Sequence, residues 1–330
     1  MRPPYSVLFG SVSFLFAACA SPRQFDFIVR NGTVYDGSGG KPFVGDVAIR
    51  ADTIAAIGNL GGATGKTELD AKGLAVSPGF INMLSWANLS LIEDGRSQAD
   101  IRQGVTLEVM GEGESMGPLN DSMKREMRQQ QGDLRFDVAW TTLGEYLDHL
   151  VRRGISPNVA SFVGATSVRI HELGYADRPP TPAELARMRG LVRGAMEEGA
   201  LGVGSSLIYA PAFYARTDEL IELCRAAAPY GGMYISHLRS EGNQLLPAID
   251  ELLTIAREAG VPAEIYHLKA AGKANWGKMD AVIRKVDSAR AVSSWQPRGE
   301  VTNQWQDAPE PALPAQGSEP WAGEGLKPKR

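Results

Sequence analysis

The sequence is poor in the residues that most often hold metals or form disulfides. It has 2 cysteines and 4 histidines among 330 residues, and its net charge is -4. An acidic balance argues against nucleic-acid binding, which needs a basic face to replace the counterions on phosphates. Cys224 lies in an apolar helical pattern, so we expect it to be a buried core residue rather than a nucleophile. No structural disulfide is expected.

The sequence also lacks an apolar run long enough to span a bilayer at its start. Arg2 precedes two short apolar segments, and residues 1–20 therefore resemble a signal peptide. Residues 15–19 (LFAAC) resemble a bacterial lipoprotein box, with Phe16 where an aliphatic residue is usual. Ordinary cleavage at residues 18–20 fits as well. We predict export, either to the periplasm or to a lipid anchor on the bacterial envelope.

Short strands dominate the next segment, residues 25–76. The pair Asn31-Gly32 tolerates positive φ, so it predicts a hairpin between 27–30 and 33–35. Two further strands are expected at 46–50 and 53–57. This segment forms a small β layer that differs from the rest of the chain.

Strands and helices alternate over residues 77–291, which predicts an α/β fold with parallel strands. Thr181, Pro182 and Glu184 give a capping box with proline at the first helical position. The expected strands are 76–81, 105–109, 159–163, 201–205, 233–237 and 263–267. These make six strand–helix units, whereas a closed TIM-type barrel needs eight, so the predicted barrel is incomplete.

A short phrase occurs twice in this region. Residues 235–242 read ISHLRSEG and residues 265–272 read IYHLKAAG, and they contain two of the chain's four histidines. The carboxyl ends of parallel strands form one mouth, and imidazole is the commonest metal ligand, so the pair indicates a metal site. The alternative is that each histidine only hydrogen-bonds a neighbour. We expect His149 to be structural, and His171 stays open.

The composition changes after about residue 291. Residues 292–330 contain three of the six tryptophans and many prolines, without a helix or strand period. We expect a disordered tail that belongs to neither predicted domain. A shift of the reading frame near Ala291 is our hypothesis for this change.

Several ordered motifs carry a family resemblance. They are SPGFI at 77–81, QGVT at 103–106, GATSVR at 164–169, the two histidine phrases, and AAGKANWGK at 270–278. Over about residues 25–290 the chain resembles the N-acyl-D-amino-acid deacylases of the metal-dependent amidohydrolase superfamily. The resemblance implies a (β/α) barrel, cut short before its last strands, and a small β-sandwich to which 25–76 contributes. It also implies hydrolysis of N-acylated D-amino acids.

The resemblance assigns metal ligands residue by residue. His237 and His267 match the family's zinc-binding histidines, and Glu112 stands where relatives have a cysteine. A carboxylate with two histidines is a common hydrolytic zinc set. Glu114 is the alternative carboxylate. Relatives carry His-x-His after the first strand, where this chain has residues 84–86 (LSW), so a single zinc ion is expected.

The same resemblance bears on the substrate. Lys269 matches a lysine that meets the substrate carboxylate, Arg239 is a further candidate, and Tyr209 could line the acyl pocket. For Arg239 an ion pair with Glu241 is the alternative. The family's catalytic aspartate follows the eighth strand, so the catalytic residue stays unknown. We predict a hydrolase of N-acylated amino acids. One alternative is an inactive truncation, an exported remnant that binds a metal or a ligand without catalysis. The other is a binding module of the cell envelope.

Overall fold

A computed structural model describes residues 24–292, and these fall into two units divided after Pro78. The predicted leader (1–20) and the predicted tail beyond Val292 lie outside the described residues.

The first unit is one β-sheet. Its strands are β1 (Gln24–Val34), β2 (Phe43–Arg50), β3 (Thr53–Gly58), β4 (Thr64–Asp70) and β5 (Ala75–Val76). They lie in the order β3-β2-β1-β4, and β5 also pairs with β1. A small cluster of Phe25, Ile28, Ala48 and Ala63 is buried on the sheet. The predicted strands at 46–50 and 53–57 are the antiparallel pair β2–β3, with Ala51 at φ +53° in their turn.

The predicted hairpin at Asn31-Gly32 is wrong, because β1 runs through both residues as a single strand. Asn31 does adopt a positive φ of 59°, but the chain bulges there instead of reversing. The backbone N–H of Asn31 donates to Asp46, and its side chain donates to Asp70. These two carboxylates satisfy the bulge and let the strand continue, so the positive-φ residue marks a bulge.

The second unit contains parallel strands that follow the chain order. They are β6 (Phe80–Asn82), β7 (Val105–Met110), β8 (Asn158–Ser161), β9 (Val163–Gly164), β10 (Gly202–Ser206), β11 (Met233–His237) and β12 (Ala263–Ile265). β6, β7 and β8 form one sheet, and β9 to β12 form the next. Only Phe162 separates β8 from β9, and its N–H donates to the Met110 carbonyl. Each expected strand overlaps an observed one, but 76–81 is divided between β5 of the first unit and β6, and no closed barrel forms within residues 24–292.

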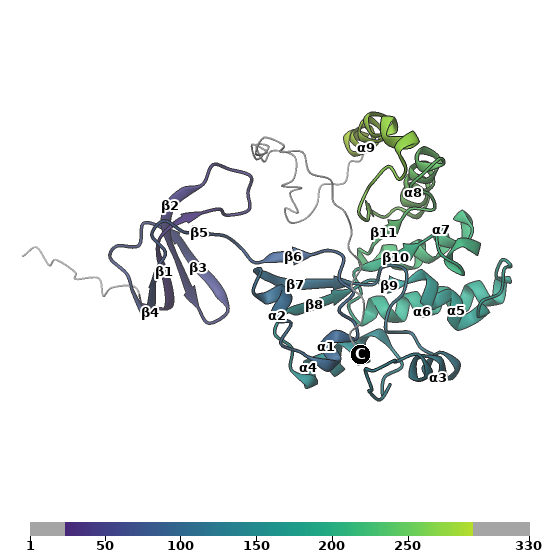
Figure 1. Cartoon of the computed structure of the whole chain (residues 1–330), viewed down its shortest axis with the longest axis horizontal. Helices are drawn as coiled ribbons and strands as arrows, with labels where there is room; N and C mark the ends of the chain where they lie inside the picture. Colours follow the sequence, from purple (N-terminus) through teal and green to yellow (C-terminus); the bar gives the residue numbers. More distant parts are fainter. Residues whose placement is uncertain (1–23, 293–330) are drawn as a thin grey trace, which may run out of the picture. The chain divides into compact units, whose positions relative to one another are not determined.

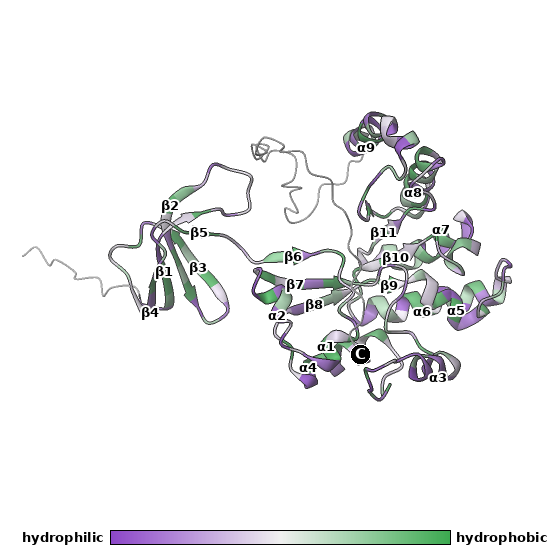
Figure 2. Ribbon diagram, in the orientation of Figure 1, coloured by the Kyte–Doolittle hydropathy of each residue, from purple (hydrophilic) through white to green (hydrophobic). Residues whose placement is uncertain are grey.

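Helices follow one another around these strands (Figure 1). They are α1 (Ser90–Glu93), α2 (Gln98–Ile101), α3 (Asp121–Gln129), α4 (Leu143–Arg153), α5 (Ala165–Leu173), α6 (Pro182–Glu197), α7 (Thr217–Ala227), α8 (Leu245–Ala259) and α9 (Met279–Val292), with 3-10 turns at Ala212–Tyr214, Ala228–Tyr230 and Lys273–Lys278. The predicted capping box of Thr181 and Glu184 is present at the start of α6. α3 buries none of its side chains and is largely hydrophilic in Figure 2.

Two hydrophobic clusters flank the parallel strands. The larger lies between strands and helices and includes Cys224, which is 1% exposed, as predicted for a core residue. A smaller cluster joins side chains on or next to successive strands on the other face: Val109, Phe162, Ile235 and Tyr266. Within residues 24–292 no helix combines the length and apolar character needed to cross a bilayer. Because side chains pack on both faces of the parallel strands, the strand ends that carry the site are held in place.

Candidate metal centre

Three side chains meet where neighbouring parallel strands end. His237 is the last residue of β11, His267 lies two residues after β12, and Glu112 lies two residues after β7. Gly111 makes this approach possible: its φ is +103°, and a Cβ atom there would lie 2.4 Å from the Phe162 carbonyl oxygen. Glycine avoids both problems, so the chain turns sharply and carries Glu112 over the strand ends.

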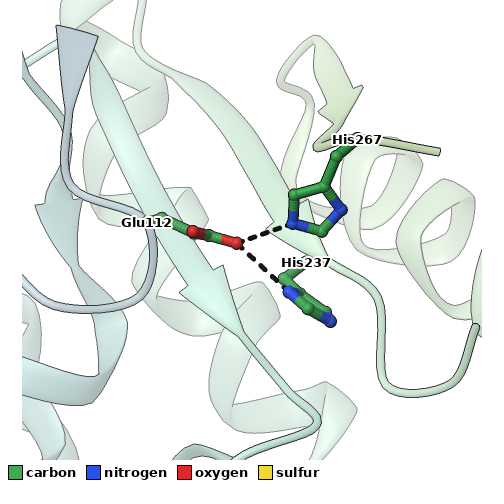
Figure 3. A group of neighbouring side chains, drawn as sticks. All are labelled: Glu112, His237 and His267. Carbon is green, nitrogen blue, oxygen red and sulfur yellow. Dashed lines mark hydrogen bonds and ion pairs between the residues drawn. The ribbon is translucent and has the colours of Figure 1, made fainter. Parts of the chain in front are cut away.

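One carboxylate oxygen faces both imidazoles (Figure 3). Glu112 Oε1 lies 3.1 Å from Nδ1 of His237 and 2.8 Å from Nε2 of His267. The two rings meet edge to face, with centroids 4.4 Å apart. The other oxygen, Oε2, accepts a hydrogen bond of 3.0 Å from the Trp86 indole. The carboxylate is therefore held from both sides with one oxygen turned to the histidines.

The donor set and its spacing suit a zinc ion. The ligand atoms of Glu112, His237 and His267 all lie within 4.8 Å of one another. Zinc bonds of about 2.0–2.1 Å in a tetrahedral shell place donors about 3.3 Å apart, so the cluster needs only a small opening. Glu112 and His237 are 7% and 6% exposed, which leaves these polar groups dependent on one another or on a cation. The structure thus brings the three predicted ligands together.

Glu114, the alternative carboxylate, does not join this cluster. It lines a smaller cavity next to Thr166, Ser206 and Tyr209. Burial, with the Glu126 carboxylate, raises the pKa of Glu114. The chain therefore presents Glu112 rather than Glu114 to the two imidazoles.

The cluster lies in a pocket of about 670 Å³. Its walls carry apolar side chains beside charged ones: Leu84, Trp86, Glu112, Ile208, Tyr209, His237, Glu241, His267 and Lys269. Tyr209 is 61% exposed, and its ring meets His237 edge to face with centroids 5.3 Å apart. Lys269 Nζ lies 2.9 Å from Nδ1 of His267. Two of the three predicted substrate-contacting residues, Lys269 and Tyr209, are therefore at the mouth.

Arg239, the third, does not line this pocket. Its guanidinium forms two hydrogen bonds of 2.8 Å with Glu251 and donates to the carbonyl oxygens of Phe213 and Ala215. The partner is Glu251 on α8, not Glu241. These contacts occupy the three nitrogens of the guanidinium, so a role in binding a substrate carboxylate has no support from its position.

The other histidines lie away from the pocket. His149 is on α4, and its ring packs 5.1 Å from the Trp140 ring. His171 is in the last turn of α5, and its Nδ1 lies 3.0 Å from the Glu172 carboxylate. Both contact neighbours on or beside their helices, and neither joins the ligand cluster.

Sequence reasoning misses two residues at the site. The sequence marks Trp86 only as the place of a missing histidine, yet its indole holds Oε2 of Glu112. It marks Glu241 only as a partner for Arg239, yet this carboxylate lies against both imidazoles and Lys269. Its place in the loop directly after the strand that ends at His237 is the signal that could have found it.

Parallel strands whose carboxyl ends bring two imidazoles and a carboxylate into one pocket are an arrangement found in metal-dependent hydrolases of α/β fold. Comparisons with known proteins show which of these hydrolases the chain is similar to. A D-aminoacylase from Alcaligenes xylosoxydans xylosoxydans is 35% identical over 273 residues, which are 82% of this chain and 56% of that protein. An N-acyl-D-aspartate deacylase from the same organism is 33% identical over 274 residues, 82% of this chain and 55% of that protein.

The fold is also similar to that of a solved deacylase structure. The N-acyl-D-glutamate deacylase from Bordetella bronchiseptica, solved with zinc and a phosphonate mimic of the tetrahedral intermediate, superposes with a TM-score of 0.73 at 30% identity. The match covers 82% of this chain and 56% of that one. No family model matches the chain. Over the matched residues the chain is a homologue of these N-acyl-D-amino-acid deacylases, and it spans about half the length of these relatives.

Proposed function

We propose that this chain carries the metal site of an exported, zinc-dependent hydrolase that cleaves the linear amide bond of N-acylated amino acids, D-enantiomers above all. The products are a carboxylate and a free amino acid. The observation that carries the proposal is the convergence of Glu112, His237 and His267 at the strand ends, with ligand atoms within 4.8 Å of one another. The similarity to D-aminoacylases supports the substrate class.

The pocket residues have different roles in this proposal. Glu112, His237 and His267 would hold one zinc ion, which supplies polarisation of the acyl carbonyl and activation of water when bound. The Lys269 ammonium pairs with the carboxylate of the substrate amino acid. The acyl group packs against the apolar wall formed by Leu84, Ile208 and Tyr209. The substrate is thus held at both ends with its amide near the ligand cluster.

Proton transfer from water to the leaving amine requires a base, and the described pocket offers no free one. Its two carboxylates are Glu112, which faces the histidines, and Glu241, which bonds Lys269. The base therefore stays unassigned within residues 24–292. This observation favours a second candidate function, binding of a metal or a small carboxylate ligand without turnover.

One experiment separates the two candidates. The purified full chain is loaded with one equivalent of zinc, its metal content is measured by mass spectrometry, and amine release from N-acetyl-D-amino acids is compared with release from the L-enantiomers. We expect one tightly held zinc and D-selective release that His237→Ala abolishes. Zinc without release supports the binding function. A chain that takes up no zinc overturns the hydrolase and the metal-binding function, and calorimetric titration with an N-acetyl-D-amino acid then decides whether it binds a carboxylate ligand.

Export is a separate proposal, because the predicted leader lies outside the described residues. It rests on the sequence of residues 1–20, in which Cys19 closes the lipoprotein-like box. Cell fractionation with radiolabelled palmitate tests it. A labelled membrane protein that loses its label in Cys19→Ala supports the anchor, unlabelled periplasmic protein supports ordinary cleavage, and retention in the cytoplasm overturns export.

A further inference from the structure

A second carboxylate lies on the far side of the two imidazoles. Glu241 Oε1 is 3.2 Å from Nδ1 of His267 and 3.5 Å from Nε2 of His237. The same oxygen accepts a hydrogen bond from the Lys269 ammonium. The residue is 9% exposed, so its charge is shielded from solvent. One buried carboxylate oxygen therefore faces three nitrogens of the candidate site.

The two carboxylates divide the imidazole nitrogens between them. Glu112 faces Nδ1 of His237 and Nε2 of His267, which leaves the opposite nitrogen of each ring to Glu241. A histidine that binds a cation through one nitrogen carries its proton on the other, and that N–H needs an acceptor. Within the described part of the chain, buried Nε2 of His237 has no hydrogen bond, and Glu241 is the carboxylate that faces it.

Lys269 does not satisfy this requirement. An ammonium group only donates, so it bonds Nδ1 of His267 when that nitrogen carries no proton. Once Nε2 of His267 serves as a ligand and Nδ1 carries the proton, the acceptor in reach is Glu241 Oε1. Glu241 keeps its contact with Lys269 in either case, because a carboxylate oxygen accepts more than one hydrogen bond.

We propose that Glu241 is a positioning residue that fixes the tautomer and orientation of both ligand histidines and holds Lys269 at the pocket mouth. This inference rests on the proposed metal site. Partners of this kind outside the ligand shell change metal affinity by about 10–100-fold when they are removed. No contact between Glu241 and the metal or the substrate is implied.

The first test measures zinc affinity by competition with a chromophoric chelator. We expect Glu241→Ala to weaken zinc binding about 10–100-fold. Glu241→Gln should recover much of this loss, because the amide oxygen still accepts from an imidazole. The control is Glu258→Ala, whose exposed side chain pairs with Arg257 and should leave affinity unchanged. Wild-type affinity in Glu241→Ala overturns the inference but leaves the proposed function standing, whereas a wild-type chain that binds no zinc removes the basis for both.

A second measurement reports the tautomers directly and guards against a variant that folds poorly. Two-bond ¹H–¹⁵N spectra of the zinc-loaded wild type should show the proton of His237 on Nε2 and that of His267 on Nδ1. Glu241→Gln should retain this pattern, and Glu241→Ala should show mixed or exchanging tautomers. A fixed, unchanged pattern in a folded Glu241→Ala contradicts the inference.

Discussion

The two histidine phrases, residues 235–242 and 265–272, share a sequence pattern but occupy different environments. The His237 side chain is 8% exposed and the His267 side chain 27%. The following leucines differ more: Leu238 is 3% exposed and Leu268 is 36% exposed. The first phrase stays buried through Leu238, whereas the second, after the buried Tyr266, becomes exposed from its histidine onward.

The backbone accounts for this difference. β11 extends through His237, but β12 ends at Ile265, two residues before the matching position. His267 adopts a positive φ of 34°, which turns the chain out of the strand direction. Both histidines still reach Glu112, while the residues after them diverge. A repeated motif thus positions the two candidate metal ligands and leaves the roles of their neighbours to local packing.

The largest expected effects fall on what the phrases share. His237→Ala and His267→Ala should each weaken zinc binding by more than about 100-fold, the upper range for partners outside the ligand shell. Each variant removes one of three donors, so chelator competition should give similar losses for both. A loss confined to His237→Ala would show that the second phrase does not contribute a ligand.

The leucines should separate the phrases by stability. Leu238→Ala removes a fully buried side chain and should lower the free energy of unfolding by about 3 kcal/mol. Leu268→Ala, at the surface, should cost less than about 1 kcal/mol. Urea unfolding at a fixed zinc concentration provides the comparison. Equal losses would mean that the two phrases are packed alike.

Substitutions of the two cations, Arg239 and Lys269, should differ in their effect on ligand binding. Arg239→Met removes the ion pair of the Glu251 carboxylate, which keeps its hydrogen bond from the Thr217 hydroxyl, and should cost about 2 kcal/mol of stability. Lys269→Met also takes an ion pair from a buried carboxylate, Glu241, and should cost about 1–2 kcal/mol of stability, but unlike Arg239→Met it should weaken binding of an N-acyl amino acid about 10-fold through the lost ion pair. Unfolding and calorimetric titration check both halves. Weaker ligand binding in a stable Arg239→Met would place that arginine at the pocket after all.

The glycines that close the phrases give the smallest contrast. Gly272 has a φ of +82°, so Gly272→Ala should cost about 1–2 kcal/mol in backbone strain. The atom nearest to a Cβ at Gly242 would lie 3.7 Å away, at an ordinary contact distance, so Gly242→Ala should be nearly neutral. Thermal unfolding of the two variants measures this difference. A larger loss of stability in Gly242→Ala than in Gly272→Ala would contradict it.

Sequence reasoning recovers what depends on local pattern. Strand positions follow from apolar runs, and the α6 start follows from Thr181 and Glu184. His237 and His267 are identified because their spacing matches two strand ends. The same reasoning fails at Asn31. A positive φ is compatible with a turn or with a bulge, and the hydrogen bonds to the carboxylates of Asp46 and Asp70 favour the bulge.

Partners from distant segments are beyond such reasoning. Proximity in sequence pairs Arg239 with Glu241, but α8 brings Glu251 to it instead. The indole of Trp86 meets Glu112 across 26 positions. Contacts of this kind depend on how strands and helices pack, which a residue pattern does not encode.

X-ray absorption at the zinc edge tests the convergence of Glu112, His237 and His267 on one ion most directly. The account predicts one zinc per chain with nitrogen and oxygen ligands at about 2.0–2.1 Å, outer scattering from two imidazoles, and loss of one imidazole in His267→Ala. A sulfur ligand at about 2.3 Å, or a shell with fewer than two imidazoles in the wild type, would contradict it.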